Sequence, residues 1–107
     1  MSGDQTQGWQ FADTGAAEWQ TTPDGAEFKL VGVADGFALV VSKLEPGGNG
    51  KPHDHEAPEF LYVLDGDLTS NGVPMTAGHG YVAATGSRHS EFTSKGGCTF
   101  VSVFKLG

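Results

Sequence analysis

Cationic residues are scarce in this chain. It has six Lys and Arg against thirteen Asp and Glu, which gives a formal net charge of −7 at pH 7. With so few positive charges, no cationic patch could neutralise the phosphates of a nucleic acid. The same acidity argues against binding to an anionic membrane surface. We therefore expect neither nucleic acid nor a membrane among the partners of this protein.

Cysteine and long hydrophobic runs are also nearly absent. Cys98 is the single cysteine, so the chain cannot form an internal disulfide. No apolar run approaches the length of about 20 residues that a membrane-spanning helix needs. The first residues, Met1 to Asp4, lack the basic and then apolar layout of a signal peptide. Together these absences predict a cytoplasmic protein.

Glycine, by contrast, is abundant and spread along the chain. The seventeen glycines separate short apolar runs instead of forming one tract. This distribution is typical of tight turns that join short strands in an all-β sandwich or barrel. The length of 107 residues is near the usual size of one domain. We expect disorder over residues 1–7, a single all-β domain over residues 8–107, and no long helix.

The local patterns predict roughly eight to ten short strands. An edge strand is expected over residues 9–11, followed by one helical turn between residues 13 and 20. The residues 37–44 are almost continuously apolar, which predicts a strand covered on both faces. Further strands are expected over residues 27–33, 59–64, 80–84, 89–93 and 98–106. Three dipeptides predict tight turns: Asp35-Gly36, Asp65-Gly66 and Asn71-Gly72.

Two histidines and a glutamate follow the Gly-rich loop 46–52 at even separations. On an extended strand, residues two apart share a face, so His53 and His55 point the same way. Glu59 can join them if the pleat stays in phase. One strand cannot surround an ion, but His89 can supply a donor from another strand. Such nitrogen and oxygen donors suit a borderline divalent cation, so the spacing predicts a metal site.

The glycines around these residues give the histidines a defined frame. The pattern Gly47-x5-His53-x-His55-x3-Glu59-x6-Gly66 resembles the first motif of the cupin superfamily at every position. The pattern Gly78-x7-Gly86-x2-His89 is similar to the second motif. The second motif departs at three positions that shape turns and do not bind metal: His79, Ala84 and Thr93 stand where aspartate, proline and asparagine are common.

The resemblance implies a double-stranded β-helix, or jelly-roll, barrel that holds one divalent metal ion. Its ligands would be His53, His55, Glu59 and His89. Four protein ligands would complete a tetrahedral zinc site, whereas iron(II), manganese or nickel would keep two positions open for substrate and dioxygen. We expect iron(II), with the other three metals as alternatives, and a small molecule as the substrate or ligand.

Short strings extend the likeness to one branch of small cupins. The segments Leu44–Gly47, Glu59–Gly66 and Gly86–His89, with the late Gly97-Cys98, resemble the cupin domain of ChrR-type anti-sigma factors. They are also similar to acetylacetone-cleaving and dihydroxyacetophenone dioxygenases. The 107 residues leave no room for the helical sigma-binding domain of the anti-sigma factors. We therefore do not expect that function here.

Three classes of function remain open. The leading hypothesis is a mononuclear non-haem iron(II) dioxygenase that acts on a small diketone-like or phenolic substrate. The second is a redox-neutral isomerase, decarboxylase or lyase that acts on a small sugar acid or keto acid. The third is a non-enzymatic, metal-bound module that binds or senses a small molecule. The sequence identifies no separate catalytic acid or base.

The other candidate residues have plainer interpretations. His79 lies between two turn glycines and is expected to face solvent. Cys98 is expected to be a small buried hydrophobe without a catalytic role. Asp54 is out of phase with the ligands, and Glu91 is expected to share a face with His89.

The resemblance also implies a homodimer, because cupin strands leave edges that commonly pair between protomers. The strand 37–44, apolar on both faces, indicates that something covers its outer side. The segment from Trp9 to Phe11 is a candidate for a swapped or edge-adding strand.

Overall fold

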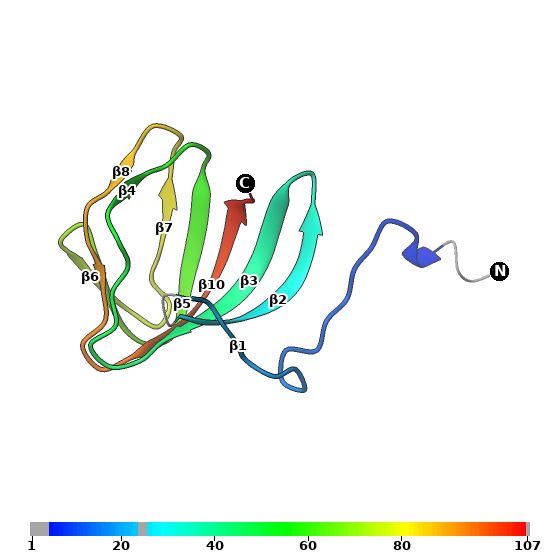
Figure 1. Ribbon diagram of the computed structural model, residues 1–107, viewed down its shortest axis with the longest axis horizontal. Helices are drawn as coiled ribbons and strands as arrows, with labels where there is room; N and C mark the ends of the chain where they lie inside the picture. Colours follow the sequence, from blue (N-terminus) through cyan, green and yellow to red (C-terminus); the bar gives the residue numbers. More distant parts are fainter. Residues whose placement is uncertain (1–4, 24–25, 107) are drawn as a thin grey trace.

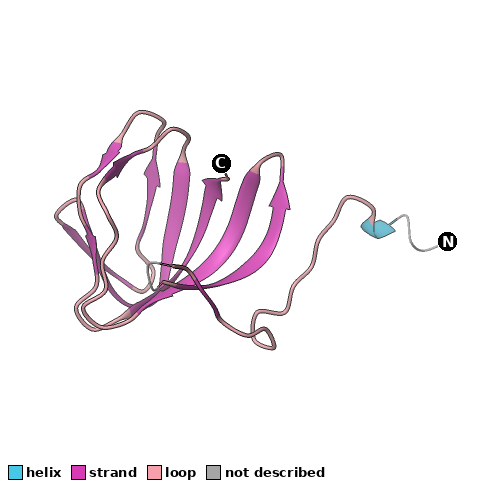
Figure 2. Ribbon diagram, in the orientation of Figure 1, coloured by secondary structure: helices cyan, strands magenta, loops and turns pink. Residues whose placement is uncertain are grey.

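Antiparallel strands build almost the whole molecule. The computed structural model describes residues 5–23 and 26–106, and Figures 1 and 2 show strands throughout, with one short helical turn at residues 5–6. This arrangement confirms the all-β prediction. The strands are β1 (Gln20–Thr21), β2 (Glu27–Ala34), β3 (Phe37–Leu44), β4 (His53–Asp54), β5 (Glu59–Ser70), β6 (Val73–Thr76), β7 (Gly80–Ala83), β8 (Arg88–His89), β9 (Phe92–Thr93) and β10 (Cys98–Lys105).

Strand β5 is the centre of the topology. The neighbours β1, β2, β3, β10 and β5 follow one another in a sheet, and the start of β5 also pairs with β7. The end of β5 pairs with β6 and β9. The short strands β4 and β8 form a separate antiparallel pair, which lies at the far side of the barrel from β2 (Figure 1).

A β-bulge lets β5 serve both ends of the barrel. Val63 pairs with Phe100 and Asp65 pairs with Thr99, so Leu64 is an extra residue without a partner. The expected turn at Asp65-Gly66 is wrong, because the strand continues through it to Ser70. Strands that change sheets commonly bend at such bulges. One strand therefore carries Glu59 at one end and Ser70 at the other.

The other two predicted turns are confirmed. Asp35 and Gly36 have φ values of 53° and 81°, and Asn71 and Gly72 have φ values of 49° and 80°. Positive φ at both central residues is the conformation of a two-residue hairpin whose twist matches its strands. These turns join β2 to β3 and β5 to β6.

The core lies between the two halves of the barrel. Along β5, Leu61 and Val63 are buried while Phe60 and Tyr62 are exposed, as alternation predicts. Strand β3 is covered on one face only, because Leu39 remains 38% exposed in the single chain. The buried cluster comprises Leu61, Val63, Leu68, Met75, Cys98 and Phe100.

The N-terminal segment differs from its prediction. Residues 9–13 have no regular structure and residues 14–17 form turns, so the expected edge strand and helical turn are wrong. The first strand is β1, which pairs with β2. The expected disorder falls in part on residues 1–4, outside the described residues, while residues 5–8 form turns. Among the described residues, no helix is long and apolar enough to cross a membrane.

Candidate metal centre

The pairing of β4 with β8 places two histidines opposite each other. His53 pairs with His89, and Asp54 pairs with Arg88. Cross-strand partners point to the same face of a sheet, so the two imidazoles lie together. On the other face, Arg88 Nη1 lies 3.0 Å from Asp54 Oδ1, and both side chains are exposed. Asp54 therefore points away from the histidines, as expected.

The third histidine is held by backbone bonds just beyond β4. His55 N donates to Ser87 O at 2.8 Å, and Gly86 N donates to His55 O at 2.8 Å. These bonds extend the β4–β8 ladder by one further step. They fix His55 beside the turn at Gly86. Gly86 is the second glycine of the second sequence motif, which ends at His89.

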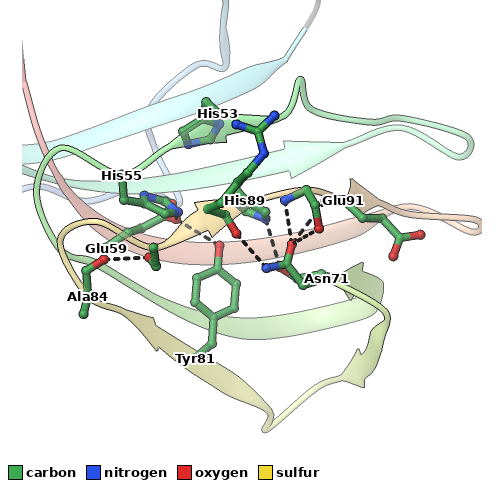
Figure 3. A network of polar contacts seen from close by, with 12 residues as sticks. His53, His55, Glu59, Asn71, Tyr81, Ala84, His89 and Glu91 are labelled. Atoms are coloured by element: carbon green, nitrogen blue, oxygen red, sulfur yellow. Dashed lines mark hydrogen bonds and ion pairs between the residues drawn. The ribbon is translucent and has the colours of Figure 1, made fainter.

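The three imidazoles converge on one point (Figure 3). The ring centroids of His53 and His55 are 4.8 Å apart, and those of His89 lie 5.3 Å from His53 and 5.4 Å from His55. One ring nitrogen from each residue lies within 4.8 Å of the others. A group of this kind could bind a metal ion.

The partners of His89 support such an ion. Ser70 Oγ lies 2.9 Å from His89 Nε2, which orients the ring. Nδ1 of the same ring is buried and has no hydrogen-bond partner among the residues that the structure describes. A buried polar atom without a partner is costly. An ion held by the histidines would give this nitrogen a partner. In contrast, His53 Nδ1 lies 3.0 Å from Lys51 O, so its Nε2 is left for a ligand.

Burial lowers the pKa of His89, and the neighbouring His53 and His55 lower it further. A depressed pKa keeps the imidazole neutral, which is the form that binds a metal. Phe92 and Tyr81 pack against the His89 ring edge-to-face, with interplanar angles of 87° each. The aromatic rings thus supply the apolar surroundings behind this effect.

Glu59 lies at the side of the cluster. Its Oε1 is 3.7 Å from His55 Nε2 and accepts a hydrogen bond of 3.0 Å from the Tyr81 hydroxyl. Among the described residues, the group whose ligand atoms lie within 4.8 Å comprises the three histidines without Glu59. The role of Glu59 as a fourth ligand therefore stays a prediction.

Tyr81 is a residue of the site that the sequence analysis missed. Burial raises its pKa, as do the charge of Glu59 and the hydrogen bond to it. Tyr81 therefore stays protonated and keeps donating to the carboxylate. It pairs with Leu61 across β5 and β7, so it shares the inner face. Only this pairing, which no local pattern encodes, could have indicated its position.

Substituting Tyr81 by phenylalanine is expected to weaken metal binding about tenfold, because partners that orient a ligand matter in this range. The change removes only the hydroxyl that holds Glu59. The affinity is measured by competition with a chromophoric chelator. Tyr62→Phe is the matched control, since Tyr62 is 49% exposed on the outer face. Equal affinities for the two variants would show that Tyr81 does not support the site.

A cavity opens in front of the histidines. It has a volume of about 740 Å³, and His53, His55, Glu59 and His89 line one side of it. Its apolar lining includes Phe92, Phe100 and Phe104. A second cavity of about 390 Å³ reaches His55 and His89 next to Tyr81. The first volume suits a small-molecule ligand.

The remaining candidates take structural roles. His79 is exposed, and its Nδ1 lies 3.0 Å from Thr76 O. Cys98 is a buried free thiol whose pKa is raised, chiefly by burial. Glu91 does not share the face of His89, because its carboxylate accepts a hydrogen bond of 2.8 Å from Gly72 N. The expectation for Glu91 is wrong, since residues 90–91 interrupt the ladder between β8 and β9.

Several solved structures have the same fold. An acetylacetone dioxygenase from Acinetobacter johnsonii matches with a TM-score of 0.76 and 14% identity, over 90% of this chain and 71% of that one. The polyketide cyclase RemF from Streptomyces resistomycificus matches with a TM-score of 0.77 and 19% identity, over 90% and 78%. The complex of Rhodobacter sphaeroides SigE with the anti-sigma ChrR matches with a TM-score of 0.73 and 18% identity, over 84% and 50%.

These identities are low, so the likeness shows the fold alone. A comparison with curated proteins found no match. The family comparison is more specific: the model of the ChrR cupin-like domain matches residues 7–106, almost the full length. With the jelly-roll arrangement of its strands and its cluster of three histidines, the chain belongs to the ChrR cupin-like family of the cupin superfamily.

Proposed function

We propose that this protein is a mononuclear non-haem iron(II) dioxygenase that acts on a small diketone-like or phenolic substrate. The observation that carries the proposal is the placement of His53, His55 and His89 at one side of a cavity of about 740 Å³. The match to an acetylacetone dioxygenase also supports this proposal. We propose His53, His55, Glu59 and His89 as the ligands of one metal ion.

The chain's own residues would bind and orient the substrate. Phe92, Phe100 and Phe104 offer an apolar wall for a planar molecule, and aromatic rings of this kind favour such contacts. Iron(II) held by His53, His55, Glu59 and His89 would supply the redox chemistry of a reaction with dioxygen.

The histidines and Glu59 would balance the charge of the centre. Three neutral imidazoles and one carboxylate leave a divalent ion with a nominal charge of about +1, which attracts the anionic enol form of a diketone. Tyr81 would keep Glu59 in place through its hydrogen bond. No side chain of the cavity is proposed as a separate acid or base.

Metal analysis and oxygen uptake test the proposal together. Protein purified without chelators is loaded anaerobically with iron(II) and assayed against a panel of diketones and catechols. We expect about one iron per chain and oxygen consumption that depends on substrate. Tight zinc binding with no oxygen uptake after iron exchange would contradict the dioxygenase and leave the metal site standing.

A redox-neutral reaction is the alternative. The match to a polyketide cyclase supports this alternative, because it shows the same fold in a protein that is not named as a dioxygenase. In this case the metal would act as a Lewis acid in an isomerase, decarboxylase or lyase reaction on a small sugar acid or keto acid. Activity with zinc and without oxygen would support it. The match to ChrR supports a third role, as a metal-bound sensor or binding module.

We also propose that the chain is a cytoplasmic homodimer. The single cysteine is free and buried, which fits a reducing compartment. The exposed side of β3, with Leu39 at 38% exposure, fits a surface that a second copy covers.

A further inference from the structure

Two of the three histidines lie on a ribbon that is separate from the main sheet. His53 and His89 belong to β4 and β8, which are two residues long and, in the described part of the chain, pair with each other alone. A two-stranded ribbon is at best marginally stable in water by itself. The geometry of the histidine cluster therefore depends on what fastens this ribbon to the barrel.

Asn71 lies at the tip of the β5–β6 hairpin and contacts the chain on both sides of His89. Asn71 Nδ2 donates a hydrogen bond of 2.9 Å to Arg88 O. On the other side, Asn71 Oδ1 accepts hydrogen bonds of 2.8 Å from Ser90 N and 3.1 Å from Ser90 Oγ. Figure 3 shows Asn71 beside His89, with dashed lines from its side chain. One amide thus uses its donor and its acceptor to hold both neighbours of a proposed metal ligand.

Further contacts join the hairpin tip to the same part of the chain. Asn71 N donates to Glu91 O at 3.0 Å, and Glu91 N donates to Asn71 Oδ1 at 3.2 Å. Gly72 N donates to Glu91 Oε1 at 2.8 Å. Ser70 Oγ lies 2.9 Å from His89 Nε2. Three consecutive residues of the hairpin therefore contact the chain at, or close beside, the proposed ligand.

The turn itself does not explain why residue 71 is asparagine. Asn71 and Gly72 have φ values of 49° and 80°, and this two-residue turn accepts asparagine or glycine at its first position. Glycine would adopt the conformation at no steric cost. Only a side chain with both a donor and an acceptor can make the hydrogen bonds to Arg88 and Ser90. The amide is therefore required by these bonds and not by the turn.

We infer that Asn71 is a positioning residue of the metal centre, which fastens the β4–β8 ribbon to the β5–β6 hairpin and so fixes His89. The inference rests on the proposed metal site. Fixing β8 also fixes His53, because His53 is the cross-strand partner of His89. A ligand that is already ordered loses less conformational freedom when it binds. The contacts of Asn71 therefore raise the affinity of the centre for its ion.

Metal affinity, measured without turnover, tests the inference. The probe is cobalt(II), which binds the nitrogen and oxygen donors that suit iron(II) and zinc, and it is titrated into the whole chain. Asn71→Gly keeps the turn and removes the side-chain hydrogen bonds. We expect it to bind cobalt(II) about tenfold more weakly, as on loss of other residues that orient a ligand.

Asn49→Gly is the matched control for this variant. Asn49 is the other asparagine of the chain, is exposed and also precedes a glycine. Its bridge to Thr93 uses backbone atoms, which glycine retains. We expect the natural affinity for this control, and thermal melts of the metal-free proteins check that each variant folds.

The visible absorption spectrum of bound cobalt(II) separates positioning from a purely structural role, because its bands depend on the arrangement of the ligands. At full loading, the bands of Asn71→Gly are expected to differ from those of the natural chain. Asn71→Asp is expected to change them too, since a carboxylate has no N–H to donate to Arg88 O.

The possible failures are distinguishable. If the natural chain binds no cobalt(II), the metal site is wrong, and this inference falls with it. If the natural chain binds cobalt(II) and Asn71→Gly keeps both its affinity and its spectrum, the positioning role alone is overturned. A lower melting temperature for Asn71→Gly, with natural affinity and bands, would likewise overturn it.

Discussion

Replacing His53 by alanine is expected to weaken metal binding at least about a hundredfold, because loss of a ligand should exceed the 10–100-fold loss that follows removal of an orienting partner. His53 is one of three imidazoles whose nitrogens lie within 4.8 Å of one another. The other two are His55 and His89, and His79 does not belong to this group. The affinity is measured with a competing chromophoric chelator, and the metal retained after gel filtration gives an independent value.

His53 is a better choice for this test than His89. His53 is exposed, so its removal leaves no cavity, whereas His89 is buried against Ser70. The matched control is His79→Ala, which removes another exposed histidine, whose ring lies within hydrogen-bond distance of Thr76. We expect natural affinity for this control. Equal affinities for the two variants would contradict the proposed site.

Part of the site could be predicted from sequence because its geometry is local. Alternation along one strand places His53 and His55 on one face, and the motif frame adds His89. The structure brings these three together through the pairing of β4 with β8. Tyr81 and Ser70 were beyond reach, because each meets the site through the pairing of distant strands.

The turns show the same limit. Asp65-Gly66 and Asp35-Gly36 are the same dipeptide, and both glycines have positive φ. Asp35-Gly36 forms a hairpin turn, whereas Asp65-Gly66 lies within β5, just past the bulge at Leu64. The difference is the presence of β10 beside Gly66, which pairs with Cys98. A local pattern gives the conformation of such a glycine and does not give its neighbours.

The prediction that Glu91 shares a face with His89 was wrong for a related reason. Alternation requires an unbroken strand, and the chain between β8 and β9 is bound by a side chain instead. Asn71 Oδ1 accepts hydrogen bonds from Ser90 N at 2.8 Å and from Glu91 N at 3.2 Å. The phase of the strand is lost across these two residues, so Glu91 turns to the β5–β6 hairpin.

Gly66→Ala is expected to cost about 3 kcal/mol of the free energy of unfolding, because overpacking and backbone strain each contribute about 1–3 kcal/mol. A Cβ at this position would lie 2.1 Å from Gly97 O and 2.7 Å from Cys98 Cα. Cys98 is the first residue of β10, and Gly97 O accepts a hydrogen bond of 3.1 Å from Asp67 N in β5, so neither backbone atom can move without disturbing the pairing. The φ of 85° adds strain. Chemical denaturation at neutral pH measures the loss.

Gly36→Ala separates the two contributions. Gly36 has a similar φ of 81°, but a Cβ there would meet nothing within 4 Å. We expect a loss of about 1 kcal/mol from backbone strain alone. The remaining difference between the variants would come from the close approach of Gly97 and Cys98 to Gly66. Equal losses would contradict this account. They would show that position 66 requires glycine for its backbone conformation and not for its packing.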